Sequence, residues 1–283
     1  MKSFTIEVTD ICPLACKHCS TFGSWDREDN VISLDEFKSV LDQYPDFETI
    51  LASGGEPFMH PQIIQLGEIA KSMNRQFQML SCGVYRQGNT YSPIPGVLIQ
   101  QCKSLVDKIS FSLHGSKDTH EKVVGVTDTF QLLDETVNRL ITERIPFSFG
   151  FVPIRTNFHD LEGAVEYVST KSKQQDYCKP NLHLLRYVKQ GSNQYLCDKP
   201  NIREELALTQ EENQQIIEQA KALQIKYQIP VALPCSMLER GCTAGIDKKG
   251  ITPYGKEYNC PALKWEVEQR TSTNGEAICK ELH

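Results

Sequence analysis

Short β-rich runs alternate with helical stretches through the first two thirds of the chain. Six strand-like runs are visible, at residues 4–9, 49–53, 77–81, 108–113, 147–152 and 182–188. Helical spacing of apolar residues marks the segments between them, at residues 34–43, 62–73, 96–103, 129–142 and 161–170. Repeated alternation favours right-handed crossovers and a parallel sheet. Six units are fewer than the eight of a closed barrel, so we predict an α/β fold, an open, partial (β/α)6 barrel like a TIM barrel, with its site at the carboxyl ends of the strands.

The alternation of strand-like and helical patterns ends after Gly191. A connection rich in Asn, Gln and Lys leads to a predicted helix at residues 209–227, where Thr209 and Glu212 form a capping-box pattern. Residues 230–283 are dense in Gly, Pro and Cys and contain a hairpin-like pattern at 251–258. So short a segment buries too little apolar surface to fold on its own and needs an additional cross-link, such as a bound metal. We therefore divide the chain into a barrel (1–191), a linker with a connecting helix (192–229) and a small Cys-rich extension (230–283).

Charge and cysteine usage narrow the class of protein. The formal net charge of −6 and the pI near 5.7 argue against a nucleic-acid partner, which needs a concentrated basic face. The start of the chain lacks the pattern of a signal peptide, and no run of about 18 apolar residues occurs, so we expect a cytoplasmic protein without a membrane partner. Cytosolic thiols stay reduced, so the 11 cysteines are better read as metal ligands than as disulfides.

Three of these cysteines stand within eight residues, just after the first predicted strand. Cys12, Cys16 and Cys19 have the spacing Cys-x3-Cys-x2-Cys. Three thiolates from one loop can bind three irons of a [4Fe-4S] cluster and leave the fourth iron without a protein ligand, open to a ligand with amino and carboxylate groups. The alternative is a structural zinc site that uses the same cysteines with His18.

The triplet resembles the cluster-binding motif of the radical S-adenosylmethionine (radical SAM) superfamily, and His18 occupies the slot before the last cysteine that is usually aromatic. The resemblance implies a partial (β/α)6 barrel, a [4Fe-4S] cluster with an open iron and bound S-adenosylmethionine. A second motif follows the second strand. There, Gly-Gly-Glu-Pro resembles the family motif that holds the cofactor's amino group, through Gly54, Gly55, Glu56 and Pro57. Taken alone, the two glycines permit close backbone approach and the Glu offers an acceptor to an ammonium group.

Further cofactor contacts are implied along later strands. Ser110, Ser112 and His114 share one face by the two-residue period of a strand and resemble the family's fourth strand, which contacts the ribose and carboxylate. Hydroxyls turned to solvent would give the same pattern. The resemblance also puts residues after the fifth and sixth strands beside the cofactor's carboxylate and adenine: Arg155, Asn157 and Val188. Surface salt bridging would explain Arg155 equally well.

The cysteines of the tail resemble the twitch or SPASM extension of the superfamily. Four thiolates suffice for one auxiliary [4Fe-4S] cluster, and the expected ligands are Cys235, Cys242, Cys260 and Cys279. The later cysteine run of a full SPASM domain is missing, so we expect one auxiliary cluster. Cys197 or Cys178 could replace Cys279, and a zinc ribbon is the alternative to a cluster.

One cysteine of the barrel is a candidate catalytic residue. Cys82 ends the third predicted strand, at the barrel rim, where a thiol could donate a hydrogen atom to a substrate radical. Simple packing is the alternative, and it is the preferred interpretation for Cys102 in a predicted helix.

The resemblance implies a radical SAM enzyme that cleaves S-adenosylmethionine to a 5′-deoxyadenosyl radical and abstracts hydrogen from its substrate. No Gly-x-Gly-x-x-Gly fingerprint for a flavin or nicotinamide occurs, so a flavodoxin or ferredoxin is the expected electron donor. The leading substrate is a ribosomally made peptide, modified by a thioether, a carbon–carbon link or epimerisation. The alternatives are oxidation of a small molecule such as an amino sugar alcohol, or a non-catalytic metal-binding redox or scaffold protein, which would not need the motif at 54–57.

Overall fold

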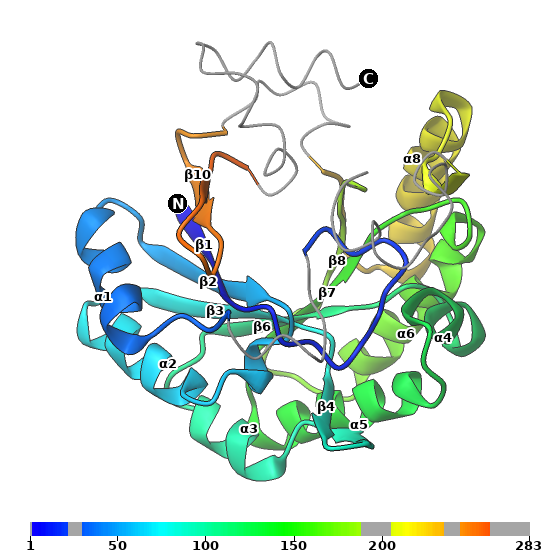
Figure 1. Ribbon diagram of the computed structural model, residues 1–283. Coiled ribbons are helices and arrows are strands. Elements are labelled where there is room, and N and C mark those ends of the chain that lie inside the picture. Colours follow the sequence, from blue (N-terminus) through cyan, green and yellow to red (C-terminus); the bar gives the residue numbers. More distant parts are fainter. Residues whose placement is uncertain (1, 22–29, 188–204, 235–243, 261–283) are drawn as a thin grey trace.

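The computed structural model describes residues 2–21, 30–187, 205–234 and 244–260, and Figure 1 shows their arrangement. Nine of the described strands form one sheet in the order β11-β10-β1-β2-β3-β6-β7-β8-β9. Their bounds are β1 (Ser3–Thr9), β2 (Thr49–Gly54), β3 (Gln76–Ser81), β6 (Lys108–Ser112), β7 (Phe147–Phe151), β8 (Leu182–Leu184), β9 (Val231–Ala232), β10 (Lys248–Ile251) and β11 (Glu257–Tyr258). Neighbours pair in parallel throughout, except for the antiparallel pair β10–β11.

The helices cover the outside of this sheet, which is curled into a half-barrel (Figure 1). They are α1 (Leu34–Gln43), α2 (Ile63–Ser72), α3 (Gly96–Cys102), α4 (Lys117–Val124), α5 (Thr129–Glu143), α6 (Leu161–Lys173) and α8 (Gln210–Tyr227), with short 3-10 turns η1 (Pro57–Met59) and η2 (Phe158–Asp160). Each of the six predicted strands is present, as β1, β2, β3, β6, β7 and β8. The prediction of a partial (β/α)6 barrel is therefore confirmed. None of the described helices combines the length and apolar composition that crossing a membrane requires.

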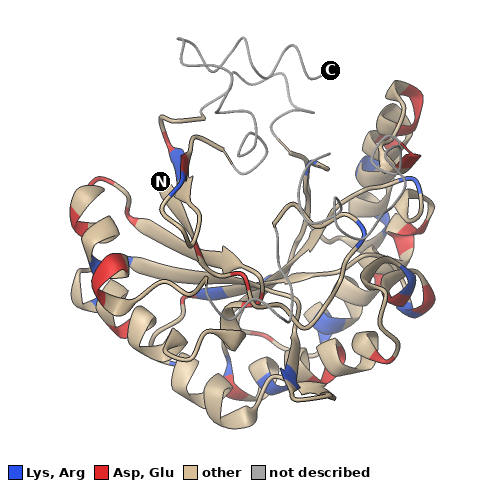
Figure 2. Ribbon diagram, viewed as in Figure 1, with Lys and Arg blue, Asp and Glu red and all other residues tan. Residues whose placement is uncertain are grey.

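The two faces of the sheet differ in chemistry because side chains alternate along each strand. One row across the sheet, paired strand to strand, faces the helices and is fully buried: Ile6, Ala52, Met79, Ile109 and Phe147. The neighbouring row on the other face carries Leu80, Ser110 and Ser148. Charged residues lie mostly on the outer helices (Figure 2). In this row the concave face thus carries two serines beside Leu80.

Some elements were not foreseen. Helix α4 begins after Ser116 and ends at Gly125, whose φ is +76°, a left-handed conformation that suits glycine. A small hairpin of β4 (Val84–Gln87) and β5 (Thr90–Pro93) turns at Gly88, where φ is +58°. Both elements are short, so they carry little periodic signal in the sequence.

The predicted hairpin at residues 251–258 is present and joins the barrel sheet. Strand β10 lies in parallel beside β1 and continues through a turn at residues 252–256 into β11. Tyr258 is buried and its hydroxyl donates to Glu7 Oε1 at 3.1 Å, which ties the hairpin to β1. Gly250 makes room for that ring, since a Cβ there would lie 2.3 Å from it. The division of the chain into domains stays a prediction.

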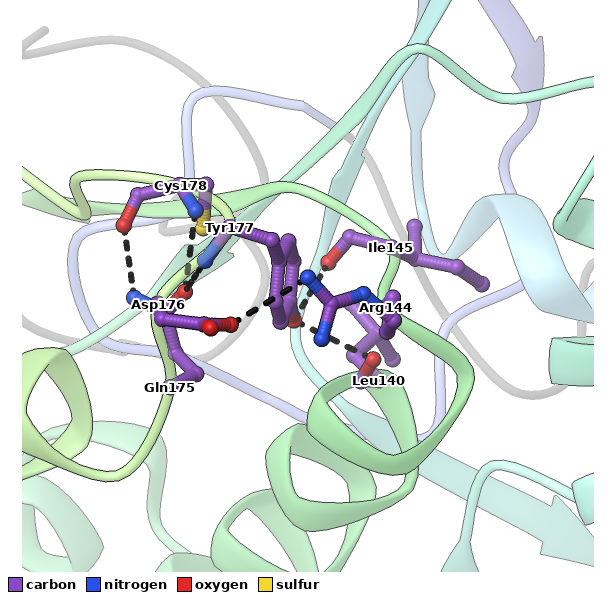
Figure 3. A network of polar contacts seen from close by, with 7 residues as sticks. All are labelled: Leu140, Arg144, Ile145, Gln175, Asp176, Tyr177 and Cys178. Atoms are coloured by element: carbon purple, nitrogen blue, oxygen red, sulfur yellow. Dashed lines mark hydrogen bonds and ion pairs between the residues drawn. The ribbon is translucent and has the colours of Figure 1, made fainter.

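A polar network fixes the corner between α5 and the strands β7 and β8 (Figure 3). The Tyr177 hydroxyl reaches the carbonyl oxygens of Leu140 at 3.2 Å and Ile145 at 3.1 Å. The Gln175 amide oxygen accepts from the backbone N–H groups of Tyr177 and Cys178 at 3.0 and 2.9 Å. Cys178 therefore lies at the amino end of β8, whereas the cysteine triplet follows the carboxyl end of β1.

Candidate active site

The three clustered cysteines follow β1 and remain free thiols in one loop. The Cys19 amide donates to the Cys16 carbonyl at 3.1 Å, which folds the loop back on itself. Burial raises the pKa of the Cys16 thiol well above its ordinary value, and the neighbouring Cys12 and Cys19 raise it further. The charges of Cys12 and Cys19 therefore act on the Cys16 thiol, as expected of thiolates gathered in one loop.

Backbone contacts with the Gly-Gly-Glu-Pro loop hold the start of this cysteine loop. Gly55 N–H donates to the Thr9 carbonyl at 2.6 Å and Glu56 N–H donates to the Ile11 carbonyl at 2.8 Å. A Cβ on Gly55 would lie 2.2 Å from the Ile11 oxygen. Gly54 has φ +121°, and a Cβ there would meet the Thr9 oxygen at 2.3 Å. Both glycines thus allow close approach of the cysteine loop itself, whereas the sequence suggested approach of a ligand.

Glu56 lies fully buried beside the cysteine loop. Its Oε1 accepts from Phe58 N–H at 3.1 Å and from the Ser81 hydroxyl at 2.9 Å, and its Oε2 accepts from Cys82 N–H at 2.6 Å. Burial raises the pKa of Glu56, although these hydrogen bonds favour the ionised form and oppose the rise. A buried carboxylate held by three donors is well placed to take a cationic ligand such as an ammonium group.

Cys82 contacts the Glu56 carboxylate. It follows β3, and its N–H donates to Glu56 Oε2. The thiol also donates to the Val84 carbonyl at a long 3.5 Å. Burial raises the pKa of the Cys82 thiol well above its ordinary value, and Cys12 and Glu56 add to the rise. Cys82 thus follows the carboxyl end of β3, as the sequence indicated, and its role as a hydrogen-atom donor stays a prediction.

Three histidine rings are in contact at the site, and one of them, His18, belongs to the cysteine loop itself. The ring centroids of His18 and His114 are 4.4 Å apart, and those of His114 and His120 are 5.5 Å apart. His114 N–H donates to His120 Nδ1 at 3.3 Å. Burial lowers the pKa of His18 and of His120 to about 4, and that of His114 well below its ordinary value. These rings are therefore neutral at physiological pH.

Several nitrogen atoms of these three rings are buried without a hydrogen-bond partner in the described part of the chain. They are Nδ1 of His18, both ring nitrogens of His114 and Nε2 of His120. Buried polar groups normally have a partner, so unpaired atoms beside the cysteines are what a bound ligand or water would satisfy. His120, on α4, was not singled out from the sequence, because nothing in its local pattern distinguishes it from a core histidine.

The remaining predicted cofactor residues lie in different surroundings. Ser110 and Ser112 are on the concave face, and the Ser148 hydroxyl donates to Ser110 Oγ at 3.1 Å. Asn157 is fully buried, and its amide accepts from Ile154 N–H at 2.8 Å and donates to the Val152 carbonyl at 3.1 Å. Its side chain therefore holds its own loop together.

Arg155 is half exposed, and its Nε lies 3.6 Å from Glu212 Oε1 on α8. This ion pair is the surface interaction that the sequence left open for Arg155, and its cofactor role stays a prediction. Cys260 is the described tail cysteine, two residues after β11. The other predicted residues lie outside the described part of the chain: Val188, Cys197, Cys235, Cys242 and Cys279.

The chemistry of the donor set fits an iron–sulfur cluster better than a single metal ion. Among the described residues, no three Cys, His, Asp or Glu side chains converge closely enough to bind one ion. In a [4Fe-4S] cluster each thiolate binds a different iron, so the sulfur atoms need not converge on one point. The His18 ring, needed for a Cys3His zinc site, instead lies edge-on against His114.

The fold and the donor residues together define a class of protein. Its members have a parallel half-barrel with three thiols, suited to bind an iron–sulfur cluster, in the loop after the first strand. The family is then fixed by comparison with known proteins. A model of the Radical SAM superfamily matches residues 6–168, and the chain belongs to that superfamily. The superfamily uses a [4Fe-4S] cluster with S-adenosylmethionine, for which Cys12, Cys16 and Cys19 are the expected ligands.

Curated relatives are similar over different lengths. The AdoMet-dependent heme synthase of Nitratidesulfovibrio vulgaris is 28% identical over 159 residues, which cover 55% of this chain and 41% of the relative. The PqqA peptide cyclase of Methylorubrum populi is 21% identical over 268 residues, which cover 91% of this chain and 65% of the relative. The chain thus spans less than two thirds of either relative.

One solved structure has a fold similar to that of nearly the whole chain. Streptococcus suis SuiB bound to its precursor peptide SuiA superposes with a TM-score of 0.68 at 13% identity, covering 96% of this chain and 62% of SuiB. At that identity the likeness concerns the fold, and it extends beyond the segment of the family match.

Proposed function

We propose that the protein cleaves S-adenosylmethionine reductively and uses the resulting radical to modify a peptide. The observation that carries the proposal is the loop of three free thiols packed against the buried Glu56 at the carboxyl ends of the strands. When bound, a [4Fe-4S] cluster on Cys12, Cys16 and Cys19 would supply one electron to the sulfonium of S-adenosylmethionine. The C5′–S bond would then break to give methionine and a 5′-deoxyadenosyl radical that abstracts hydrogen from the substrate.

The protein's own residues bind and orient. Glu56 offers a fixed carboxylate to the amino group of the cofactor, since Phe58, Ser81 and Cys82 already hold its oxygen atoms in place. His18 and His114 present unpaired ring nitrogens to the same region. Ser110 and Ser112 line the concave face, where hydroxyls can hydrogen-bond the ribose and carboxylate. Binding inside the curve of the sheet excludes bulk water from the reacting bond.

The peptide substrate is supported by relatives whose similarity continues past the family match. The similarity to PqqA peptide cyclase runs over 268 residues, and SuiB, solved with its precursor peptide SuiA, follows 96% of this chain in fold. A polar concave face also suits a peptide, whose backbone offers many hydrogen-bond groups. A flavodoxin or ferredoxin is the proposed electron donor.

One auxiliary [4Fe-4S] cluster in the C-terminal extension, residues 230–283, is part of this proposal. Gly245 N–H donates to the Asn259 carbonyl at 3.1 Å, which brings a segment that shortly follows Cys242 beside the residue that precedes Cys260. The hairpin that carries Cys260 is tied to the barrel through Tyr258. Cys242 and Cys260 are therefore the central pair of proposed ligands, with Cys235 and Cys279 completing the set.

A second candidate is a reaction on a small molecule. It is favoured by the 28% identity to the AdoMet-dependent heme synthase, which is higher than that to the peptide cyclase but is confined to 55% of the chain. Mass spectrometry separates the two: incubation with the peptide encoded beside the gene should change the mass of the peptide. An unchanged peptide, with S-adenosylmethionine still consumed, would favour the small molecule.

The activity itself is tested by anaerobic loading with iron and sulfide, dithionite reduction and assay for 5′-deoxyadenosine. We expect cleavage by the wild type, no cleavage by Cys16→Ala, and cleavage like the wild type by Cys102→Ala, which changes a buried free thiol of α3. Cys242→Ala should spare cleavage at least partly. A loaded wild-type protein that never cleaves the cofactor would remove the enzyme assignment.

A further inference from the structure

The ring of His114 is oriented by packing rather than by hydrogen bonds. The side chain is buried, and neither of its ring nitrogens has a partner among the described residues. Its ring centroid lies 4.4 Å from that of His18, in the cysteine loop, and 5.5 Å from that of His120, on α4. The direction of its two nitrogen atoms therefore depends on the neighbours that hold the residue in place.

The backbone of His114 leaves the sheet at this point and is held by His120. The ladder continues one residue past β6, since Leu113 N–H donates to the Gly150 carbonyl at 2.9 Å. The next N–H, that of His114, instead donates to His120 Nδ1 at 3.3 Å. His120 thus contacts both the backbone and the ring of His114.

His120 is itself fixed within the fold. Its N–H donates to the Ser116 carbonyl at 2.8 Å inside α4, and its buried ring packs edge-on against Phe130 with the centroids 5.8 Å apart. Asp160 holds the start of the same helix, because its Oδ2 accepts from Ser116 N–H at 2.8 Å and from the Ser116 hydroxyl at 2.6 Å. His120 is therefore a fixed support for the residue that ends the strand.

Resting on the proposed function, we propose that His120 is a positioning residue, which holds the His114 backbone through its Nδ1 and so directs the His114 ring toward bound S-adenosylmethionine. The unpartnered nitrogens of His114 then form a hydrogen bond with a polar group of the cofactor, such as its carboxylate or ribose. A buried N–H that loses its acceptor turns toward another partner, and the ring on the same residue moves with it. Affinity for the cofactor then falls, although the cluster ligands are unchanged.

The test is titration calorimetry of S-adenosylmethionine into the anaerobically loaded, unreduced full-length protein, so that the cofactor binds without being cleaved. His120→Phe keeps a ring but offers no acceptor, and we expect it to raise the dissociation constant about tenfold, or about 1.4 kcal/mol. His120→Asn places an amide oxygen where Nδ1 accepts, so it should stay within about threefold of the wild type. His159→Asn, at an exposed histidine, is the control and should match the wild type. Equal affinity of His120→Phe and the wild type, or equal losses in Phe and Asn, overturns the proposal.

A double-mutant cycle shows whether His120 acts through His114. His114→Ala alone should weaken binding, and His120→Phe should add less than about twofold to that loss in the His114→Ala background. A full further loss there would mean that His120 acts independently, through its own Nε2, which also has no partner among the described residues, and would overturn the positioning role. Iron content is measured in each variant, and affinities are expressed per bound cluster.

A measurement on the wild type needs no variant that loads poorly. Hydrogen–deuterium exchange of residues 113–120 should slow when S-adenosylmethionine is added, and exchange at the same rate with and without the cofactor would contradict the proposal. If the loaded wild type does not bind S-adenosylmethionine, the proposed function fails; if it binds and His120→Phe binds equally well, only the role of His120 fails.

Discussion

At the scale of single residues, the site is built from groups that are costly to bury. Glu56 and His114 are both buried almost completely, and each needs a compensating partner. Glu56 has three protein donors, whereas the ring nitrogens of His114 have no partner among the described residues. The Glu56 carboxylate is therefore held in place by the fold, whereas the His114 ring nitrogens are left for a ligand or water to satisfy.

The buried histidines make stability depend on pH. The pKa of His120 is lowered to about 4 in the folded state, against about 6.5 when unfolded. Between these values the unfolded chain takes up a proton that the folded protein does not. Stability is thus full above pH 6.5 and falls as pH drops towards 4, by about 1 kcal/mol for this residue between pH 7.5 and 5.5.

Urea unfolding of the iron-loaded protein at pH 7.5 and 5.5 measures this loss of stability. His120→Gln should lose about 1 kcal/mol less than the wild type over that range. His159→Gln, which changes an exposed histidine, should behave like the wild type. Equal pH dependence in all three proteins would show that His120 titrates normally in the folded state.

Sequence motifs named the candidate site residues but not the residues that contact them. Cys12, Cys16, Cys19 and Glu56 could be named because short spacings and one loop signature mark them. The hydrogen bond from Cys82 N–H to Glu56 and the edge-on packing of His18 against His114 join segments far apart in the chain. Only the three-dimensional fold brings such residues together, so a local pattern cannot reveal them.

At the scale of elements, the cysteine loop is shaped by the loop after β2. The backbone of Gly55 is in direct contact with Thr9 and Ile11, and the hydrogen bonds there leave no room for a side chain. The loop that carries the carboxylate and the loop that carries the thiols are therefore one packed unit.

Gly55→Ala tests this packing. Its Cβ would lie 2.2 Å from the Ile11 oxygen, so we expect the cysteine loop to shift, with a loss of about 1–3 kcal/mol of stability and less bound iron. Gly96→Ala is the matched control, since nothing lies within 4 Å of its Cβ position. Iron content and urea midpoints measure both effects, and a Gly55→Ala protein with full iron content would contradict the packing argument.

The regular elements were largely predictable, because their periodic patterns are strong. Ser33 and Thr209 begin α1 and α8 through capping boxes, as their sequences indicated. Helix α4 and the β4–β5 hairpin were missed, since they are short and their apolar spacing is weak. Strand β10 was recognised as part of a hairpin, but its pairing with β1 depends on contacts 245 residues apart, as between Ser3 and Lys248.

At the scale of the whole molecule, the tail is bound to the barrel by the first strand. Glu7 and Tyr258 are buried together on the side of β1 that faces the inside of the curve, and β1 leads directly to the cysteine loop. The segment that carries Cys260 and the loop that carries Cys12 thus depend on the same strand. We therefore expect a change that disturbs one of these segments to disturb the other as well.

Tyr258→Phe removes the hydroxyl that binds Glu7 while keeping the ring. We expect the free energy of unfolding to fall by about 1–3 kcal/mol, because a buried carboxylate loses a donor. Tyr254→Phe, at a half-exposed tyrosine in the same hairpin, should stay within about 0.5 kcal/mol of the wild type. Equal stability of the two variants in urea would mean that the pair contributes nothing to the junction.

The presence of an open iron in the N-terminal cluster is tested most directly by electron paramagnetic resonance of anaerobically loaded, reduced protein before and after S-adenosylmethionine is added. The Cys242→Ala variant, measured in parallel, weakens any signal from the auxiliary site. A spectrum that changes on addition of the cofactor, in both proteins, is the predicted result. A spectrum that ignores the cofactor, or zinc in place of iron in the loaded protein, would contradict it.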